Sequence, residues 1–349
     1  MDFHPKLKSK YFDENCNRRL IDEPVCEEKV FRDIQSTYSE NLKKIVQICK
    51  SHSIKIIMVA PAGNYVNWQP SRSIRWRTLN DYETAKWENF YKKAIELKEQ
   101  NKNQEALAYL TTCLNIDSTF AQVQYDYAEV LVRLGKFSEA QRAFKSAVDF
   151  DGAPKIASTV LINKMSEICN EYDIPFINVN EIFESQSLKN INDPKFFVDA
   201  HHLSWIGDLL IAKALRDVII ENFMISTNTS SENVIIPNDI ELLHRLGLTR
   251  QDSVDFFIGR ANWYLKVSEF RWNGERRLAT AKENIDKALL LAPNNTKVLI
   301  SHALWACLSN KPEIAMQHLH SARINNEELC LQIIRSPWVR HILQKIHIE

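Results

Sequence analysis

A spacing of 34 residues between small and apolar positions constrains the fold of this sequence most. In the first half of the chain it relates one set of three residues to the next: Ala106, Leu110 and Cys113, then Ala140, Phe144 and Ala147. Near the end of the chain it does so again: Ala281, Ile285 and Ala288, then Ala315, Leu319 and Ala322. Small residues that recur at a helical interval allow neighbouring helices to approach closely, and the apolar residues fill the contact. The spacing therefore predicts two arrays of stacked helical hairpins.

The sequence at the turn between the expected helices supports this prediction. The segment L-G-K-F-S-E-A spans residues 134–140, and Asn101 takes the position of Gly135 one repeat earlier. The period and this turn resemble the tetratricopeptide repeat (TPR). TPR arrays are scaffolds with extended binding surfaces, so the resemblance implies a protein or peptide partner.

The composition excludes several other classes of protein. Only 7 of 349 residues are glycine, which disfavours Gly-rich phosphate loops and dinucleotide-binding fingerprints. Lys+Arg and Asp+Glu are 44 each, so no basic excess indicates a nucleic-acid partner. The 7 cysteines form no C-x-x-C pair and no metal-ligand spacing is present, so we expect neither a metal nor a cofactor. The sequence shows no apolar run long enough to span a membrane and no signal-peptide core, so the cytoplasm is the default expectation.

Two short β-branched runs outside the helical arrays indicate strands. Residues 54–60 follow a helix expected over 37–51 and end at Pro61, and residues 174–179 follow a second helix with one apolar face. Units of helix, short loop and strand form parallel α/β sheets. The first helical array is therefore expected to interrupt an α/β domain.

The order of these segments predicts a mixed, mostly α architecture in four parts. They are a discontinuous α/β domain over 1–80 and 154–224, inserted TPR repeats over 84–153, a Ser/Thr/Asn-rich linker over 225–238, and a TPR-like helical domain over 239–349.

Asp199-x-x-His202 is the clearest candidate for chemistry. It lies just before an expected helix for which Ser204 is a natural N-cap. A short turn can bring the carboxylate to one imidazole nitrogen and leave the other nitrogen to accept a proton from a nucleophile. The pattern also arises by chance in a chain with 10 histidines, and the alternative is a solvated surface loop.

The run F-F-V-D-A-H-H-L-S-W-I-G resembles the last sequence block of the SGNH, or GDSL-type, hydrolases. One branch of that family carries TPR helices inserted after a strand and a P-x-x-N loop, here Pro61–Asn64. The resemblance covers about residues 37–222 as an ordered set of motifs. It implies a flavodoxin-like, three-layer α/β fold and a small ester or acylated substrate.

The resemblance also implies roles for individual residues. Asp199 would be the orienting carboxylate, His202 the general base, and Asn64 a residue that lines the pocket. His201 has no role in the family's pattern, and we expect it to be a solvated neighbour.

The family's nucleophilic serine, its oxyanion-hole glycine and its G-x-N block have no counterpart here, because the sequence begins downstream of all three. A triad without its nucleophile cannot form an acyl-enzyme. We therefore expect a C-terminal fragment or a decayed relative of such a hydrolase, inactive as this chain alone. The alternative is a non-catalytic TPR scaffold whose α/β part is only structural.

Two further stretches are expected to be structural. The loop at 61–78 interleaves Trp68 and Trp76 with three arginines, and we expect it to pack between domains rather than to recognise an anionic ligand. The charge-rich stretch at 86–105 is expected to be the solvated face of a TPR helix.

Overall fold

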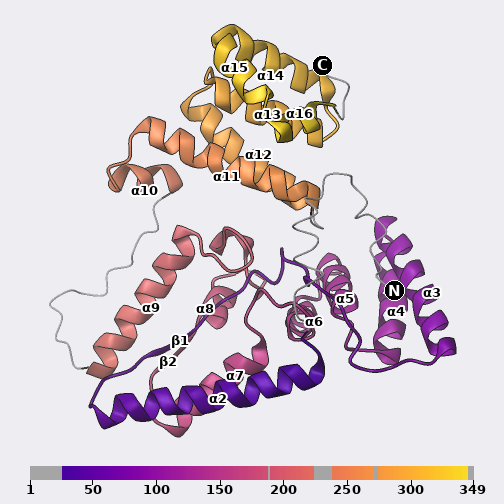
Figure 1. The fold of residues 1–349 in the computed structure, drawn as a ribbon, viewed down its shortest axis with the longest axis vertical. Helices are drawn as coiled ribbons and strands as arrows, with labels where there is room; N and C mark the ends of the chain where they lie inside the picture. Colours follow the sequence, from indigo (N-terminus) through magenta and orange to yellow (C-terminus); the bar gives the residue numbers. More distant parts are fainter. Residues whose placement is uncertain (1–25, 188, 224–237, 271–273, 345–349) are drawn as a thin grey trace. The chain divides into compact units, whose positions relative to one another are not determined.

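The structure is a computed structural model that describes residues 26–187, 189–223, 238–270 and 274–344 (Figure 1). The described residues are mostly helical and fall into two compact units, divided between Glu232 and Asn233. All but the last residue of the predicted linker over 225–238 lies outside the described residues. The remaining domain boundaries stay predictions, since the first unit contains both the strands and the inserted helices.

The first unit contains eight α-helices within the described residues, together with two short strands and one 3-10 turn. In chain order these are α2 (Glu28–Ser51), β1 (Met58–Ala60), α3 (Asp81–Glu99), α4 (Asn103–Ile116), α5 (Ala121–Arg133), α6 (Phe137–Asp149), α7 (Thr159–Glu171), β2 (Phe176–Asn178), α8 (Val179–Ser185), η1 (Pro194–Phe196) and α9 (Trp205–Phe223). Helix α2 begins nine residues before its predicted start, because only Phe31 is buried in its first turns and the apolar stripe is weak there.

The inserted helices form two hairpins, α3 with α4 and α5 with α6, which confirms the prediction from the repeat. All six repeat positions between Ala106 and Ala147 are at most 1% exposed. Asn101 and Gly135 lie at equivalent turns with φ of 59° and 75°, the left-handed conformation that ends a helix and that glycine adopts without strain.

The two strands pair in parallel and form a small sheet, with Met58 opposite Phe176 and Val59 opposite Ile177. Met58 and Phe176 pack with α2 and α7, whereas Val59 and Ile177 pack with α8 and α9. The α/β prediction is confirmed only to this extent: the described residues contain a sheet of two strands, and a three-layer flavodoxin-like domain is not shown. Both strands are shorter than their β-branched runs, because only three residues of each find a partner strand.

The second unit is made of helices throughout its described residues. They are α10 (Asp239–Arg245), α11 (Arg250–Phe270), α12 (Gly274–Leu291), α13 (Thr296–Leu308), α14 (Pro312–Asn325), α15 (Glu327–Ile334) and α16 (Pro337–Gln344). Helix α13 contacts α11, α12, α14, α15 and α16 and is buried on most of its surface. The repeat positions Ala281, Ile285, Ala288, Ala315 and Ala322 are fully buried, which confirms the second array of helices.

Candidate functional site

The first helices of the two inserted hairpins are joined by a buried charged network. The Lys98 ammonium on α3 lies 2.5 Å from carboxylate oxygens of both Asp126 and Glu129 on α5. The Tyr91 hydroxyl donates a hydrogen bond to Asp126 over 2.7 Å. These groups are not solvated, since the Lys98 side chain is 12% exposed and both carboxylates less than 10%. The expectation that all charges over 86–105 face solvent is therefore wrong for Lys98, because opposite charges 28 and 31 residues later neutralise it.

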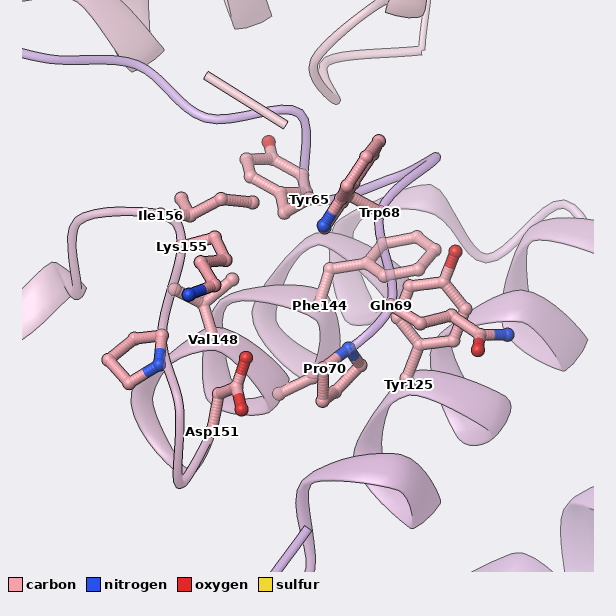
Figure 2. Close-up of a pocket in the computed structure, with 12 residues that line it drawn as sticks. Tyr65, Trp68, Gln69, Pro70, Tyr125, Phe144, Val148, Asp151, Lys155 and Ile156 are labelled. Atoms are coloured by element: carbon pink, nitrogen blue, oxygen red, sulfur yellow. The ribbon is translucent and has the colours of Figure 1, made fainter. Parts of the chain in front are cut away.

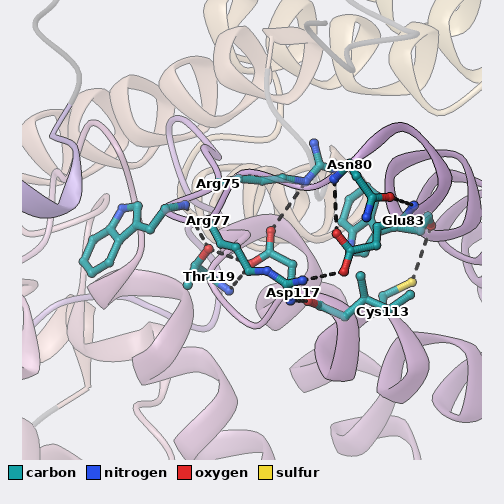
Figure 3. A network of polar contacts seen from close by, with 10 residues as sticks. Arg75, Arg77, Asn80, Glu83, Cys113, Asp117 and Thr119 are labelled. Atoms are coloured by element: carbon teal, nitrogen blue, oxygen red, sulfur yellow. Dashed lines mark hydrogen bonds and ion pairs between the residues drawn. The ribbon is translucent and has the colours of Figure 1, made fainter.

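The loop after β1 packs along the inserted hairpins and is fixed by polar contacts (Figure 3). Arg75 lies 3.5 Å from the buried Asp117 carboxylate, and its guanidinium stacks 4.2 Å from the Trp87 ring centroid. The Trp76 backbone N–H donates to the Thr119 hydroxyl over 3.0 Å. This loop makes internal packing contacts, as expected from its position between domains.

A pocket with four aromatic side chains in its lining lies beside this loop (Figure 2). Tyr65 and Trp68 come from the loop, and Tyr125 and Phe144 come from α5 and α6. Its one carboxylate, Asp151, is already engaged. It accepts backbone N–H groups of Ser71, Arg72 and Ala153 at 2.8–3.0 Å. The Asp151 carboxylate therefore fixes the loop, and the rest of the lining is aromatic and aliphatic apart from Gln69 and Lys155.

Asp199 and His202 meet in the turn before α9, as the sequence predicts. The Nδ1 atom of His202 lies 2.7 Å from Oδ2 of Asp199. The other oxygen, Oδ1, accepts the backbone N–H groups of His201 and His202 at 3.0 and 2.8 Å. A single carboxylate thus orients both the ring and the turn.

The environment of this pair keeps the carboxylate charged and the imidazole accessible. Partial burial favours the neutral acid, but the hydrogen bonds from the His202 ring and the two backbone N–H groups outweigh it and lower the pKa of Asp199. The His202 side chain is 69% exposed, and its Nε2 has no hydrogen-bond partner among the described residues. The geometry therefore leaves one imidazole nitrogen free to exchange a proton with a bound molecule.

Asn64 lies against the same turn, although its side chain supports the backbone instead of contacting the pair. Its Nδ2 donates to the Asp199 carbonyl over 3.1 Å, and its backbone N–H donates to the Ala200 carbonyl over 2.8 Å. The structure thus brings together Asp199, His202 and Asn64.

Two buried asparagines behind this loop give no signal in the sequence. Asn192 donates to the Gly63 carbonyl and to the side-chain oxygen of Asn180, both over 2.8 Å. Asn180 in turn accepts the Gly63 N–H over 3.2 Å. No local pattern links residues so far apart, so only the fold identifies them as supports of the P-x-x-N loop.

Gly207, in the first turn of α9, allows this helix to pack closely against the backbone before the Asp199 turn. A Cβ at this position would lie 2.6 Å from the Phe196 carbonyl oxygen and 3.2 Å from the Phe183 ring. The Ser204 hydroxyl accepts the Gly207 N–H over 3.4 Å, consistent with the predicted N-cap. Glycine therefore lets α9 approach the backbone that leads into the Asp199 turn.

With this geometry established, comparison with known proteins identifies part of the chain. Residues 97–159 match the family model of the tetratricopeptide repeat. The chain therefore contains tetratricopeptide repeats, and the matched segment runs from the end of α3 through α6. No curated protein sequence matches it.

Two solved structures show a distant likeness. YrrB, described as a TPR protein with an unusual peptide-binding site, is 15% identical; the match covers 73% of this chain and 97% of YrrB, with a TM-score of 0.21. A chain of the APC/C hetero-tetramer Cut9–Hcn1 is 11% identical. That match covers 91% of the present chain and 48% of the matched chain, with a TM-score of 0.22. The chain thus spans about half the length of the second match.

None of these matches is described as a hydrolase, so the resemblance to SGNH hydrolases rests on the sequence motifs alone. No helix among the described residues combines the length and apolar character needed to cross a membrane.

Proposed function

We propose that the protein is a TPR scaffold that binds a peptide or protein partner. The observation that carries the proposal is the pair of stacked hairpins α3–α4 and α5–α6, which the repeat model matches from residue 97 onward. Their repeat residues are buried and their turns are built alike. Stacked hairpins of this kind present the first helix of each repeat along one continuous surface. In the first unit this surface belongs to α3 and α5.

The exposed charges beside the buried network offer a direct test. Lys92 on α3 and Arg133 on α5 are exposed, and Arg133 also donates to the Lys98 carbonyl over 2.9 Å. Acidic peptides selected from a random library against the full chain should lose affinity roughly tenfold when both residues are changed to Glu, because two positive charges that attract them become negative. Fluorescence anisotropy measures the Kd of each variant.

A charge-matched control separates a specific surface from a general charge effect. Lys164 on α7 is half-exposed and pairs with Glu167, and Lys213 on α9 is exposed. Changing both lysines to Glu alters the net charge by the same amount and should leave the Kd unchanged. Hydrogen exchange should also show protection of α3 and α5 in the complex. Selected peptides that protect neither helix, or failure to select any peptide, would refute the scaffold proposal for this surface.

A second proposal is supported by the Asp199–His202 pair, which we infer to be the acid/base half of an acyl-transfer site. A carboxylate that holds one imidazole nitrogen at 2.7 Å while the other faces solvent is the arrangement that general-base catalysis requires. The proposed substrate is a small ester or acylated molecule. The nucleophile would have to come from outside the described residues.

Hydrolysis of the activated ester p-nitrophenyl acetate tests this second proposal, because a general base can activate water for attack on this ester without a nucleophilic side chain. His202→Gln and Asp199→Asn should each lower the rate of p-nitrophenolate release, measured above that in buffer alone, by roughly tenfold or more. The first substitution removes the base, and the second removes the group that orients it. His201→Gln is the matched control and should retain the rate. An unchanged rate in His202→Gln would exclude a catalytic role for the pair.

A further inference from the structure

The turn before α9 places three different metal-ligating side chains together. One ligand atom each from Asp199, His201 and His202 lies within 4.8 Å of the other two. The sequence predicts no metal site, because it contains no separated ligand pairs of the usual spacing. The turn supplies all three ligands from four consecutive residues instead.

We propose that Asp199, His201 and His202 bind a late first-row divalent metal ion, with Zn²⁺ the best match. Two imidazole nitrogens and one carboxylate oxygen form a donor set that suits Zn²⁺ and its neighbours, and calcium and magnesium prefer all-oxygen sites. Three protein ligands also leave a position open for water or a bound molecule. This inference does not depend on the TPR scaffold proposal.

The carboxylate is already oriented for such a role. Oδ1 of Asp199 is held by two backbone N–H groups, which directs Oδ2 toward the imidazole of His202. Bonds that fix a ligating carboxylate from behind raise metal affinity, because less orientational freedom is lost on binding.

The backbone of the turn is also fixed from both sides. The Val198 N–H donates to the His202 carbonyl over 2.8 Å, and Asn64 donates to the carbonyls of Asp199 and Ala200. The turn therefore presents its three side chains from a backbone that need not rearrange.

The change needed to admit an ion is small. Ligands of a tetrahedral zinc with bonds near 2.1 Å are about 3.4 Å apart, so Nδ1 of His202 and Oδ2 of Asp199 need to separate by about 0.7 Å from their present 2.7 Å. The His201 ligand atom lies within 4.8 Å of the other two, so it needs to approach them by at most about 1.4 Å. The nearest lysine in sequence, Lys195, pairs with Asp193 at 3.2 Å, which offsets its charge. Because the ion would replace the hydrogen bond of the pair, metal binding and general-base action are mutually exclusive.

Isothermal titration of the metal-free full chain with ZnCl₂ tests the proposal. We expect one site per chain, and a loss of affinity of roughly tenfold or more in each of Asp199→Asn, His201→Gln and His202→Gln. His52→Gln is the matched control, since His52 is an exposed histidine at the end of α2 whose ring nitrogen contacts the Ile48 carbonyl and the Ser51 hydroxyl. Its Zn²⁺ affinity should equal that of the unchanged chain.

His201→Gln distinguishes the metal site from the acid/base proposal, because it should weaken Zn²⁺ binding while leaving ester hydrolysis intact. Substitution by Co²⁺ provides a second readout, an absorption spectrum typical of four-coordinate nitrogen and oxygen ligation that is lost in the same variants. Zn²⁺ binding that is equal in all variants, or no binding by the unchanged chain, would overturn the proposal. Circular dichroism of each variant confirms that its helices are retained.

Discussion

Lys98→Met is expected to lower the free energy of unfolding of the first unit by about 3–5 kcal/mol, the usual effect of removing one partner from a buried ion pair. The substitution keeps the length of the side chain but leaves the carboxylates of Asp126 and Glu129 facing one another without their shared cation. Burial alone would lower the pKa of Lys98, but these two carboxylates outweigh that effect and raise it. The ammonium is therefore charged in the folded protein.

A compensated variant isolates the electrostatic cause. When Lys98→Met is combined with Asp126→Asn and Glu129→Gln, no unpaired charge remains and most of the stability should return. Urea unfolding, followed by hydrogen exchange at amides of α3 and α5, reports the free energy for this unit. A triple variant no more stable than Lys98→Met would show that lost packing, rather than unpaired charge, dominates.

Acidification from pH 7 to 4.5 is expected to destabilise the second unit by about 2 kcal/mol through His302 alone. This residue on α13 is 8% exposed, and neither ring nitrogen has a hydrogen-bond partner among the described residues. Burial, then the nearby His318 and Lys282, lower the pKa of His302 from 6.5 to about 4, with Lys311 adding to this and Asp286 opposing it. The unfolded chain therefore takes up a proton below pH 6.5 that the folded chain refuses until about pH 4, so stability falls across that window.

His302→Leu has no group at this position that can take up the proton. Between pH 7 and 4.5, its free energy of unfolding should therefore rise by about 2 kcal/mol relative to that of the unchanged chain. His320→Leu changes an exposed histidine on α14 and should show no such shift. Hydrogen exchange at amides of α13 measures both. Parallel pH profiles for the unchanged chain and His302→Leu would contradict the expectation.

The parts of this structure that the sequence predicts are those whose signal is local or periodic. The hairpins follow from residues such as Ala106 and Ala140, because a helix interface requires a small side chain at the same place in every repeat. The contact between Asp199 and His202 follows from a four-residue turn that needs no tertiary information.

The remainder depends on partners that only folding brings together. The charge of Lys98 is typical of a solvated helix face, and only the approach of α5 shows that it is buried. Asn180 and Asn192 are isolated polar residues in the sequence, and their role depends on a loop more than a hundred residues earlier. His201 has no role in the SGNH pattern, and only the geometry of the turn shows that it lies beside two other possible metal ligands.

The small sheet also has a consequence for how the chain folds. Met58 and Phe176 are adjacent in space, yet all of α3 to α7 lies between them in sequence. Joining such distant segments of an unfolded chain carries a large entropic penalty, and that penalty is smaller when the intervening chain is already compact. The Ser73–Asp151 bridge and the Gly152 N–H to Arg72 carbonyl bond, 2.7 Å long, bring the two ends of the inserted hairpins together. We therefore expect that the assembled hairpins bring the two strands close to one another, so that substitutions that destabilise the hairpins slow strand pairing even where they leave the strands unchanged.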